Sequence, residues 1–284
     1  MVIKSLFKPR GKIEIQAPDS IPPGESLHLE LRITAGEEIS PREVRAELVG
    51  DETYYQKVHR GYGYTVLHNT FARIVQTVAE QPALSQGVEQ KWNCSLQVPP
   101  DILPACRGQW VNISWTLKAV VDVPKRVDLS QEKPIQVFCP PPQVNNMPVL
   151  PAEKTFSQVA LSLKAPQVVS SGTSLKGQLN LLVKESLDIS GIRVELVQVE
   201  DAHDRKANQV VSTTHISGKA SFSQNESPSF PFSLDVPAGA PPTAICKFSG
   251  LRWKVRAIID RKMKTDFNVE QELFVYNAPK LTDK

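Results

Sequence analysis

Apolar and polar residues alternate with a period of two along most of this chain. In residues 27–33 leucine and isoleucine occupy every second position, and residues 111–121 repeat the arrangement around a tryptophan. Such alternation is typical of a β-strand with one buried and one solvated face. No amphipathic helix longer than a few turns is evident, although a short helix and a strand fit residues 76–84 equally well. The pattern therefore predicts an all-β protein built from antiparallel strands.

One long pattern occurs twice in the chain. Residues 92–129 align without a gap with residues 230–267, at an offset of 138. Further upstream, residues 44–49 align with residues 192–197 at an offset of 148. The first copy therefore carries ten additional residues between these two blocks. Insertions collect in surface loops, so we expect the additional residues around positions 59–70.

A repeat of this length corresponds to a whole domain. We expect a first domain over residues 1–139, a proline-rich linker over 140–154 and a second domain over 155–284. Each domain should be an antiparallel, immunoglobulin-like β-sandwich of roughly seven to nine strands. Trp115 and Trp253 fall on the apolar face of aligned strands, so we expect them to anchor the two cores.

Composition limits the compartment and the partners. The net charge of +3 does not indicate a nucleic-acid-binding protein. No apolar run is long enough to span a bilayer, and the first residues lack the apolar core of a signal peptide, so we expect a cytoplasmic protein. The four cysteines show no spacing typical of zinc ligands and are expected to be reduced thiols.

Three short motifs, in this order and duplicated, resemble the arrestin-like family. They are Ile21-Pro22-Pro23-Gly24 before a strand, Leu96-Gln97-Val98-Pro99 at a strand end, and the strand end Lys118-Ala119-Val120-Val121-Asp122-Val123-Pro124. The resemblance covers roughly residues 12–277. It implies tandem β-sandwiches of the arrestin type and a non-enzymatic adaptor or scaffold that binds membrane-protein tails, sorting components or signalling proteins.

The family also includes a retromer subunit and bacterial sporulation-control proteins, so a regulatory protein of the sporulation-control type is an alternative. Two features of the family are missing here. The chain has no Pro-Pro-x-Tyr motif, and residues 133–138 have no arginine where visual-type arrestins place a phosphate sensor. A third interpretation, an extracellular adhesion or carbohydrate-binding sandwich, is disfavoured by the missing signal peptide.

A basic stripe is the first candidate binding surface. Arg252, Lys254 and Arg256 alternate with apolar residues, and Arg261 and Lys262 follow at the strand end. Alternation leaves these side chains only the outer sheet face. The stripe could bind an acidic protein segment or an anionic membrane surface. The competing interpretation, a solvated sheet face without a partner, is the more common one.

The inserted segment is the second candidate. Arg60, Tyr62 and Tyr64 combine cationic and aromatic side chains, which are typical anchors at protein interfaces. Alternatively, the tyrosines of a long hairpin cover the structure beneath them.

Catalytic chemistry has no support in the sequence. There is no nucleophile elbow, P-loop or dinucleotide fingerprint, so we expect no enzyme, no cofactor and no small-molecule substrate. The polar run over residues 200–204 is interpreted as a hairpin loop rather than a metal site. We also expect Asp122 and Asp260 to pair with the basic residues that follow them in the chain.

Overall fold

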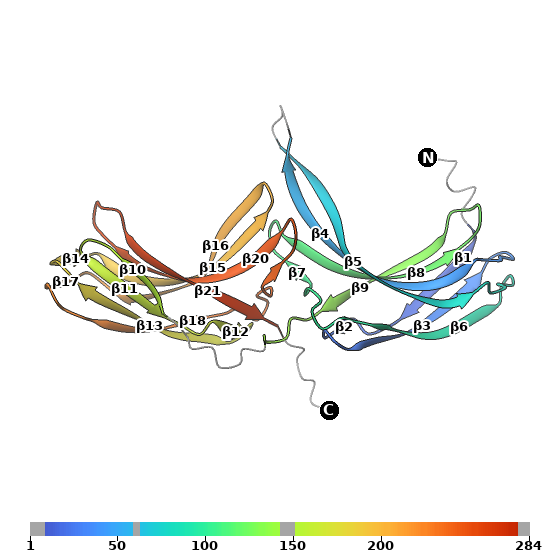
Figure 1. The fold of residues 1–284 in the computed structure, drawn as a ribbon, viewed down its shortest axis with the longest axis horizontal. Helices are drawn as coiled ribbons and strands as arrows, with labels where there is room; N and C mark the ends of the chain where they lie inside the picture. The colour runs from blue at the N-terminus through green and yellow to red at the C-terminus, as the bar shows by residue number, and fades with distance from the viewer. Residues whose placement is uncertain (1–8, 59–62, 143–150, 278–284) are drawn as a thin grey trace. The chain divides into compact units, whose positions relative to one another are not determined.

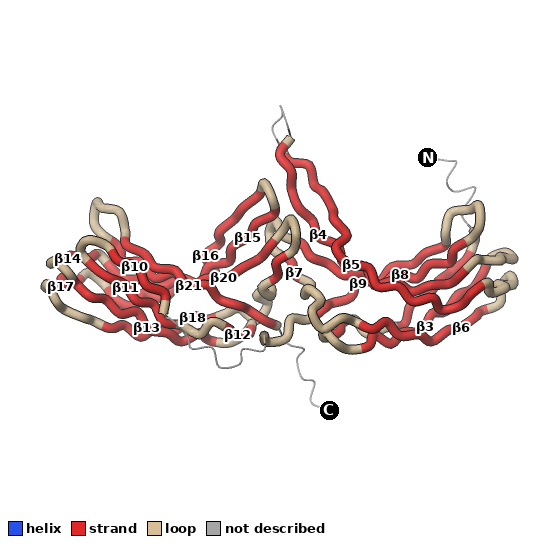
Figure 2. Tube along the Cα trace, in the orientation of Figure 1, coloured by secondary structure: helices blue, strands red, loops and turns tan. Residues whose placement is uncertain are grey.

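The computed structural model describes residues 9–58, 63–142 and 151–277. Strands connected by turns and loops make up this part of the chain (Figures 1 and 2). Nothing in the described ranges forms a helix that could cross a membrane. The segment 76–84, which was ambiguous in sequence, continues as a strand to Glu80.

Contacts divide the chain into two compact units. Unit 1 comprises Met1–Thr53, Leu67–Ala105 and Asn112–Phe138. Unit 2 comprises Cys139–Lys284 and, in addition, the short segments Tyr54–Val66 and Cys106–Val111 from earlier in the chain.

Unit 1 is a sandwich of two sheets. The smaller sheet has the strand order β1-β3-β6, and the larger has the order β2-β9-β8-β4-β5. The strands are β1 (Gly11–Gln16), β2 (Ser20–Ile21), β3 (Ser26–Ala35), β4 (Glu43–Lys57), β5 (Tyr64–Glu80), β6 (Glu89–Gln97), β8 (Asn112–Asp122) and β9 (Leu129–Val137).

Unit 2 repeats this architecture with a sheet β10-β11-β13-β18 and a sheet β12-β21-β20-β15-β16. A small pair, β14-β17, lies beside them. The strands are β10 (Ala152–Thr155), β11 (Val159–Lys164), β12 (Val168–Ser170), β13 (Ser174–Val183), β14 (Leu187–Ile189), β15 (Gly191–Ala202), β16 (Arg205–Ser217), β17 (Ala220–Phe222), β18 (Ser229–Asp235), β19 (Ala244–Ile245), β20 (Gly250–Asp260) and β21 (Phe267–Tyr276). The two-residue strand β19 pairs with β20, and the two-residue strand β7 (Cys106–Arg107) pairs with β8.

The strands of the two copies follow each other at the two sequence offsets. β1, β3 and β4 correspond to β11, β13 and β15 at the larger offset, whereas β8 and β9 correspond to β20 and β21 at the smaller one. The chain is thus a tandem of two antiparallel β-sandwiches, as the repeat predicts.

A buried tryptophan anchors each core. Trp115 in β8 and Trp253 in β20 are each 1% exposed, which confirms the prediction from alternation. The indole Nε1–H of Trp115 donates to the Leu103 carbonyl at 2.9 Å, and that of Trp253 donates to the Pro241 carbonyl at 3.0 Å. The donors and the acceptors are related by the same smaller offset, so the duplication includes the hydrogen bond that a buried indole needs.

The additional residues of the first copy lengthen one hairpin. In unit 2 the two residues His203 and Asp204 connect β15 to β16, because Ala202 is paired with Arg205. In the first copy residues 55–66 occupy the corresponding place, which overlaps the predicted region 59–70 but begins four residues earlier. Arg60 and Tyr62 belong to this hairpin but lie outside the described residues.

Candidate binding surfaces

The basic stripe lies on the outer face of β20, where alternation places it. Trp253 and Val255 are buried, and the basic side chains between them point the other way. Arg252 is exposed, but the side chains of Lys254 and Arg256 are only 21% and 27% exposed. The stripe is therefore less accessible than the sequence suggested.

Acidic residues of the neighbouring strands neutralise two of the three cations. Lys254 Nζ lies 2.8 Å from Glu270 Oε2 on β21. Arg256 donates to Glu195 Oε2 on β15 through Nη2 at 2.6 Å and through Nε at 3.0 Å. The expectation of three solvent-facing cations on one surface is thus wrong for Lys254 and Arg256, because sequence alternation does not reveal the charge on adjacent strands.

Glu195 explains why Arg256 is needed. Its side chain is 8% exposed and also accepts from Arg193 Nε at 2.9 Å. Burial raises the pKa of the Glu195 carboxyl, but the hydrogen bonds from Arg193 and Arg256 outweigh burial and hold the pKa below its ordinary value. The carboxylate is charged and depends on its arginines, so Arg256 has a structural role.

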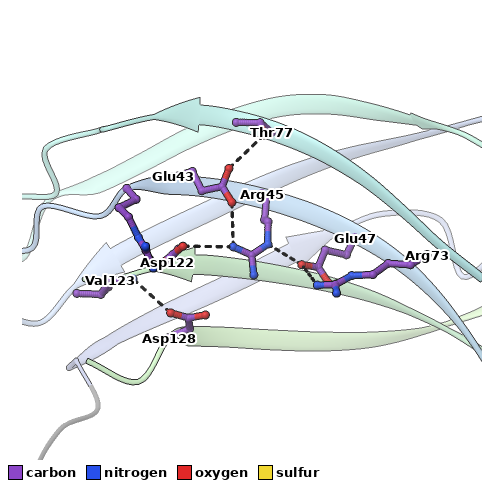
Figure 3. A network of polar contacts seen from close by, with 9 residues as sticks. Glu43, Arg45, Glu47, Arg73, Thr77, Asp122, Val123 and Asp128 are labelled. Atoms are coloured by element: carbon purple, nitrogen blue, oxygen red, sulfur yellow. Dashed lines mark hydrogen bonds and ion pairs between the residues drawn. The ribbon is translucent and has the colours of Figure 1, made fainter. Parts of the chain in front are cut away.

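Unit 1 has the same arrangement on the outer face of its larger sheet (Figure 3). Glu47 is 2% exposed and accepts from Arg45 Nε at 2.6 Å. Its second arginine is Arg73, whose Nη2 lies 2.7 Å from Oε1. Arg73 belongs to β5, whereas Arg256 belongs to β20, so the two copies provide the second arginine from different strands.

The strand-end aspartates use partners other than those expected. Asp122 accepts from Arg42 Nη2 at 2.7 Å, and Asp260 pairs with Arg193. Both arginines lie at the start of the neighbouring strand or just before it. The expected pairing with the basic residues that follow in sequence is therefore wrong, because the antiparallel neighbour brings its arginine closer than the turn does.

The last two residues of the stripe, Arg261 and Lys262, have different surroundings in the turn after β20. The Arg261 guanidinium lies 3.6 Å from the centre of the Phe267 ring, and its Nε donates to the Thr265 carbonyl at 2.8 Å. Lys262 is exposed, and the neighbouring Met263 is 96% exposed. Arg261 therefore shapes the turn, whereas Lys262 and Met263 project from it.

Tyr64, the described member of the second candidate set, contacts a cation of its own chain. The guanidinium of Arg205 lies 3.7 Å from the centre of the Tyr64 ring and 4.3 Å from that of the Trp110 ring. All three residues belong to unit 2. A guanidinium between two rings is a favourable cation–π arrangement. This placement matches the alternative interpretation, in which the hairpin tyrosine covers structure beneath it.

Sequence reasoning missed the role of Glu200. Its side chain accepts hydrogen bonds from three consecutive backbone N–H groups, those of Gln109, Trp110 and Val111, at 2.9, 2.7 and 3.0 Å. A Cβ atom at Gly108 would lie 2.4 Å from the carboxylate, so a side chain there would displace it. Glu200 is 2% exposed and belongs with these residues to unit 2.

A signal for this site is present in the sequence. Every second residue of β15 points into the core, as shown by the buried Ile192, Val194 and Leu196. The next two residues in this alternation are Gln198 and Glu200. Polar residues at inward positions need internal partners. Gln198 Nε2 indeed donates to Glu200 Oε1 at 2.7 Å. The loop that donates the three N–H groups lies about 90 residues earlier in the chain, so only the fold identifies it.

The smaller sheets differ at one edge. In unit 2, β11 pairs with β13 on one side and with β10 on the other. In unit 1 the corresponding strand β1 pairs with β3 alone in the part of the chain that the structure describes. Within residues 9–58, 63–142 and 151–277, nothing pairs with the other edge of β1, whereas its counterpart carries an added strand there.

The backbone direction of this edge follows from the pairing. The Gly36 N–H donates to the Arg10 carbonyl, so Arg10 and Gly36 form a hydrogen-bonded pair. Hydrogen-bonded and non-hydrogen-bonded pairs alternate in antiparallel sheets, which leaves Ile13 and Ile15 with N–H and C=O groups directed away from β3.

Two family models match the chain, one for each copy. Residues 12–142 match the C-terminal domain of arrestin (or S-antigen), and residues 157–281 match SpoOM protein. The two matches together support an arrestin-like family for this chain. No curated protein matches it. The first copy of this chain matches a model of the C-terminal, not the N-terminal, domain of arrestin. This match is consistent with a chain made of two copies of one fold.

Removing Arg256 should destabilise unit 2. Arg256→Gln leaves the buried Glu195 carboxylate with one arginine, and we expect a loss of about 1–3 kcal/mol in the free energy of unfolding. Arg252→Gln, two outward positions earlier on the same strand, is the control and should change stability little. Urea denaturation measures both variants. Equal stabilities would show that Arg256 is not needed to hold Glu195.

The Glu200 site should make stability depend on pH. Burial raises the pKa of the Glu200 carboxyl, but the N–H donors of residues 109–111 outweigh burial, and the pKa lies below the ordinary 4.5. A carboxyl with a lowered pKa stabilises the fold above the ordinary value and loses this effect as the pH falls through the folded-state pKa. The wild-type advantage over Glu200→Gln should be full at pH 7 and shrink below about 4.5. Urea denaturation of both proteins across this range tests it, and a difference that is independent of pH would contradict it.

Proposed function

We propose that this arrestin-like chain is a non-enzymatic cytoplasmic adaptor that binds an extended segment of a partner protein by strand addition to β1. The observation that carries the proposal is the edge of β1, which no described residue pairs with, compared with the occupied edge of β11. Exposed edges with unpaired N–H and C=O groups are templates for another strand. Membrane-protein tails, sorting components and signalling proteins are the partners that family membership suggests.

The occupied edge in unit 2 supports a specific geometry. β10 runs antiparallel to β11, from Ala152 opposite Leu163 to Thr155 opposite Ala160. The Phe156 N–H donates to the Val159 carbonyl just beyond this pairing. By analogy, a partner segment would run antiparallel to β1 and bond to the backbone of Ile13 and Ile15.

The side chains of β1 suggest what the segment should contain. Ile13 is buried, whereas Lys12 and Glu14 form an ion pair on the outer face. Opposite charges directly across two strands are favourable, and like charges are unfavourable. The preferred segment would place an acidic residue opposite Lys12, a basic residue opposite Glu14 and an apolar residue between them.

A proline in β1 tests the proposal. Ile15→Pro removes an outward N–H group but leaves the bonds to β3, which edge strands tolerate. The control is Ser95→Pro in β6, the opposite edge of the same sheet. Its N–H also points outward, because the Val98 N–H bonds to Glu25 and the pattern alternates.

We expect the partners captured by proximity labelling in the native cell to be retained by Ser95→Pro and lost from Ile15→Pro. Thermal melting first establishes that both variants fold. In hydrogen exchange, the Ile13 and Ile15 amides should become protected when a captured partner is added. An unchanged set of partners for folded Ile15→Pro would refute strand addition at β1.

Peripheral contact with an anionic membrane surface is a second candidate role, favoured by the turn after β20. Met263 is 96% exposed and lies between the exposed Lys262 and Lys264. An apolar side chain flanked by cations suits an anionic lipid surface. Co-sedimentation with vesicles containing phosphatidylserine should decrease for Lys262→Gln/Lys264→Gln, and an absence of binding by the wild-type protein would exclude this role.

A further inference from the structure

The larger sheet of unit 2 has a hollow near the N-terminal end of β20. Its volume is about 690 Å³, and its side-chain lining comes from β19, β20 and β21 and the approach to β12. The lining residues used below are Ile245, Arg252, Glu272 and Phe274. The hollow is distant in register from the Glu195 ion pairs, which involve Arg256 farther along β20.

Arg252 is the cation of this hollow, and it differs from the other two cations of the stripe. Lys254 pairs with Glu270, and Arg256 pairs with Glu195. Arg252 is exposed and has neither an ion pair nor a side-chain hydrogen bond to any residue within the described ranges. Its guanidinium is thus available for an anion from outside the chain, with donors suited to a carboxylate.

Two apolar side chains lie near Arg252, on the side of β20 that faces β19 and β21. Ile245 on β19 is 51% exposed. It is paired with Gly250, which lies two residues before Arg252 on β20. On β21, Leu273 is paired with Trp253, which places Phe274 across from Arg252. Gly250 has no side chain to fill the space beside Ile245. A cation beside an exposed isoleucine and a half-buried phenylalanine offers one polar and two apolar contacts.

One acidic residue limits the charge of the ligand. Glu272 also lines the hollow and has no ion-pair partner in the described part of the chain. It would repel a second anionic group bound next to the first. The hollow therefore suits a ligand with a single negative charge beside apolar groups better than a polyanion.

We propose that this hollow binds a short segment of a partner protein in which one aspartate or glutamate lies next to bulky apolar residues. The carboxylate pairs with Arg252, and the apolar side chains pack on Ile245 and Phe274. This site is separate from the β1 edge and does not depend on strand addition. Of the basic residues of the stripe, only Arg252 takes part in this site. The apolar contacts beside it could not be read from the sequence.

The first copy provides a natural comparison. At the smaller repeat offset, Ser114 stands in place of Arg252, Arg107 in place of Ile245 and Gln136 in place of Phe274. The combination of one cation and two apolar side chains is thus particular to the second copy. The substitution Arg252→Ser therefore introduces the residue that the first copy has at the same strand position.

A phage-displayed library of random short peptides tests the site. The library is selected on the full chain and counter-selected on Arg252→Ser. Enriched peptides should share one acidic residue next to bulky apolar residues. In fluorescence anisotropy, an enriched peptide should bind Arg252→Ser about ten-fold more weakly or worse, because a charge-assisted hydrogen bond is lost. Ile245→Ser should weaken binding as well.

Two controls separate this site from others. Lys254→Gln removes the next outward charge on the same strand and should leave peptide affinity unchanged, since Lys254 is outside the hollow. Ile15→Pro should also bind normally, so a failure of the β1 proposal does not affect this result. No enrichment over Arg252→Ser, or enriched peptides without an acidic residue, would overturn the inference. Equal melting temperatures of Arg252→Ser and the wild-type protein exclude misfolding.

Discussion

Burial of the apolar faces of the central strands between two sheets is the constraint on which the rest of this structure depends. Trp115 and Trp253 fill the centres of the two cores, and each has its indole N–H bonded to a backbone carbonyl. Because inward positions are mostly apolar, charged residues lie mainly on the outer sheet faces and the edges, and an inward one such as Glu200 needs internal hydrogen bonds. Binding to another molecule must therefore use outer faces, edges or turns.

Charges on an outer sheet face need not form a binding surface. Glu47 and Glu195 are buried on their sheets, and each is held by two arginines. A buried carboxylate is costly without such partners, which explains why both copies retain the arrangement. That the second arginine comes from different strands shows that the requirement is for a cation at this location, not for a particular residue.

The two copies have diverged mainly where the fold does not constrain them. β10 covers the edge of β11, while β1 has no such neighbour among the described residues. The lengthened β4–β5 hairpin adds Tyr64, which packs on Arg205. Duplication followed by change at edges and loops leaves the cores alike and gives each copy its own contacts.

The sequence by itself determined the strands, the duplication, the tryptophan cores and the position of the insertion. Periodicity and internal alignment suffice for these features, because each depends on the order of residues within one strand or on its copy. The resemblance to the arrestin-like family followed from motifs of the same local kind.

Only the tertiary structure decided which charges are free. Lys254, Arg256 and Arg252 look equivalent in sequence, but Glu270 and Glu195 come from strands β21 and β15 and reach only the first two. Ion pairs and hydrogen bonds act over a few ångströms in space, and sequence distance carries no information about neighbours across a sheet.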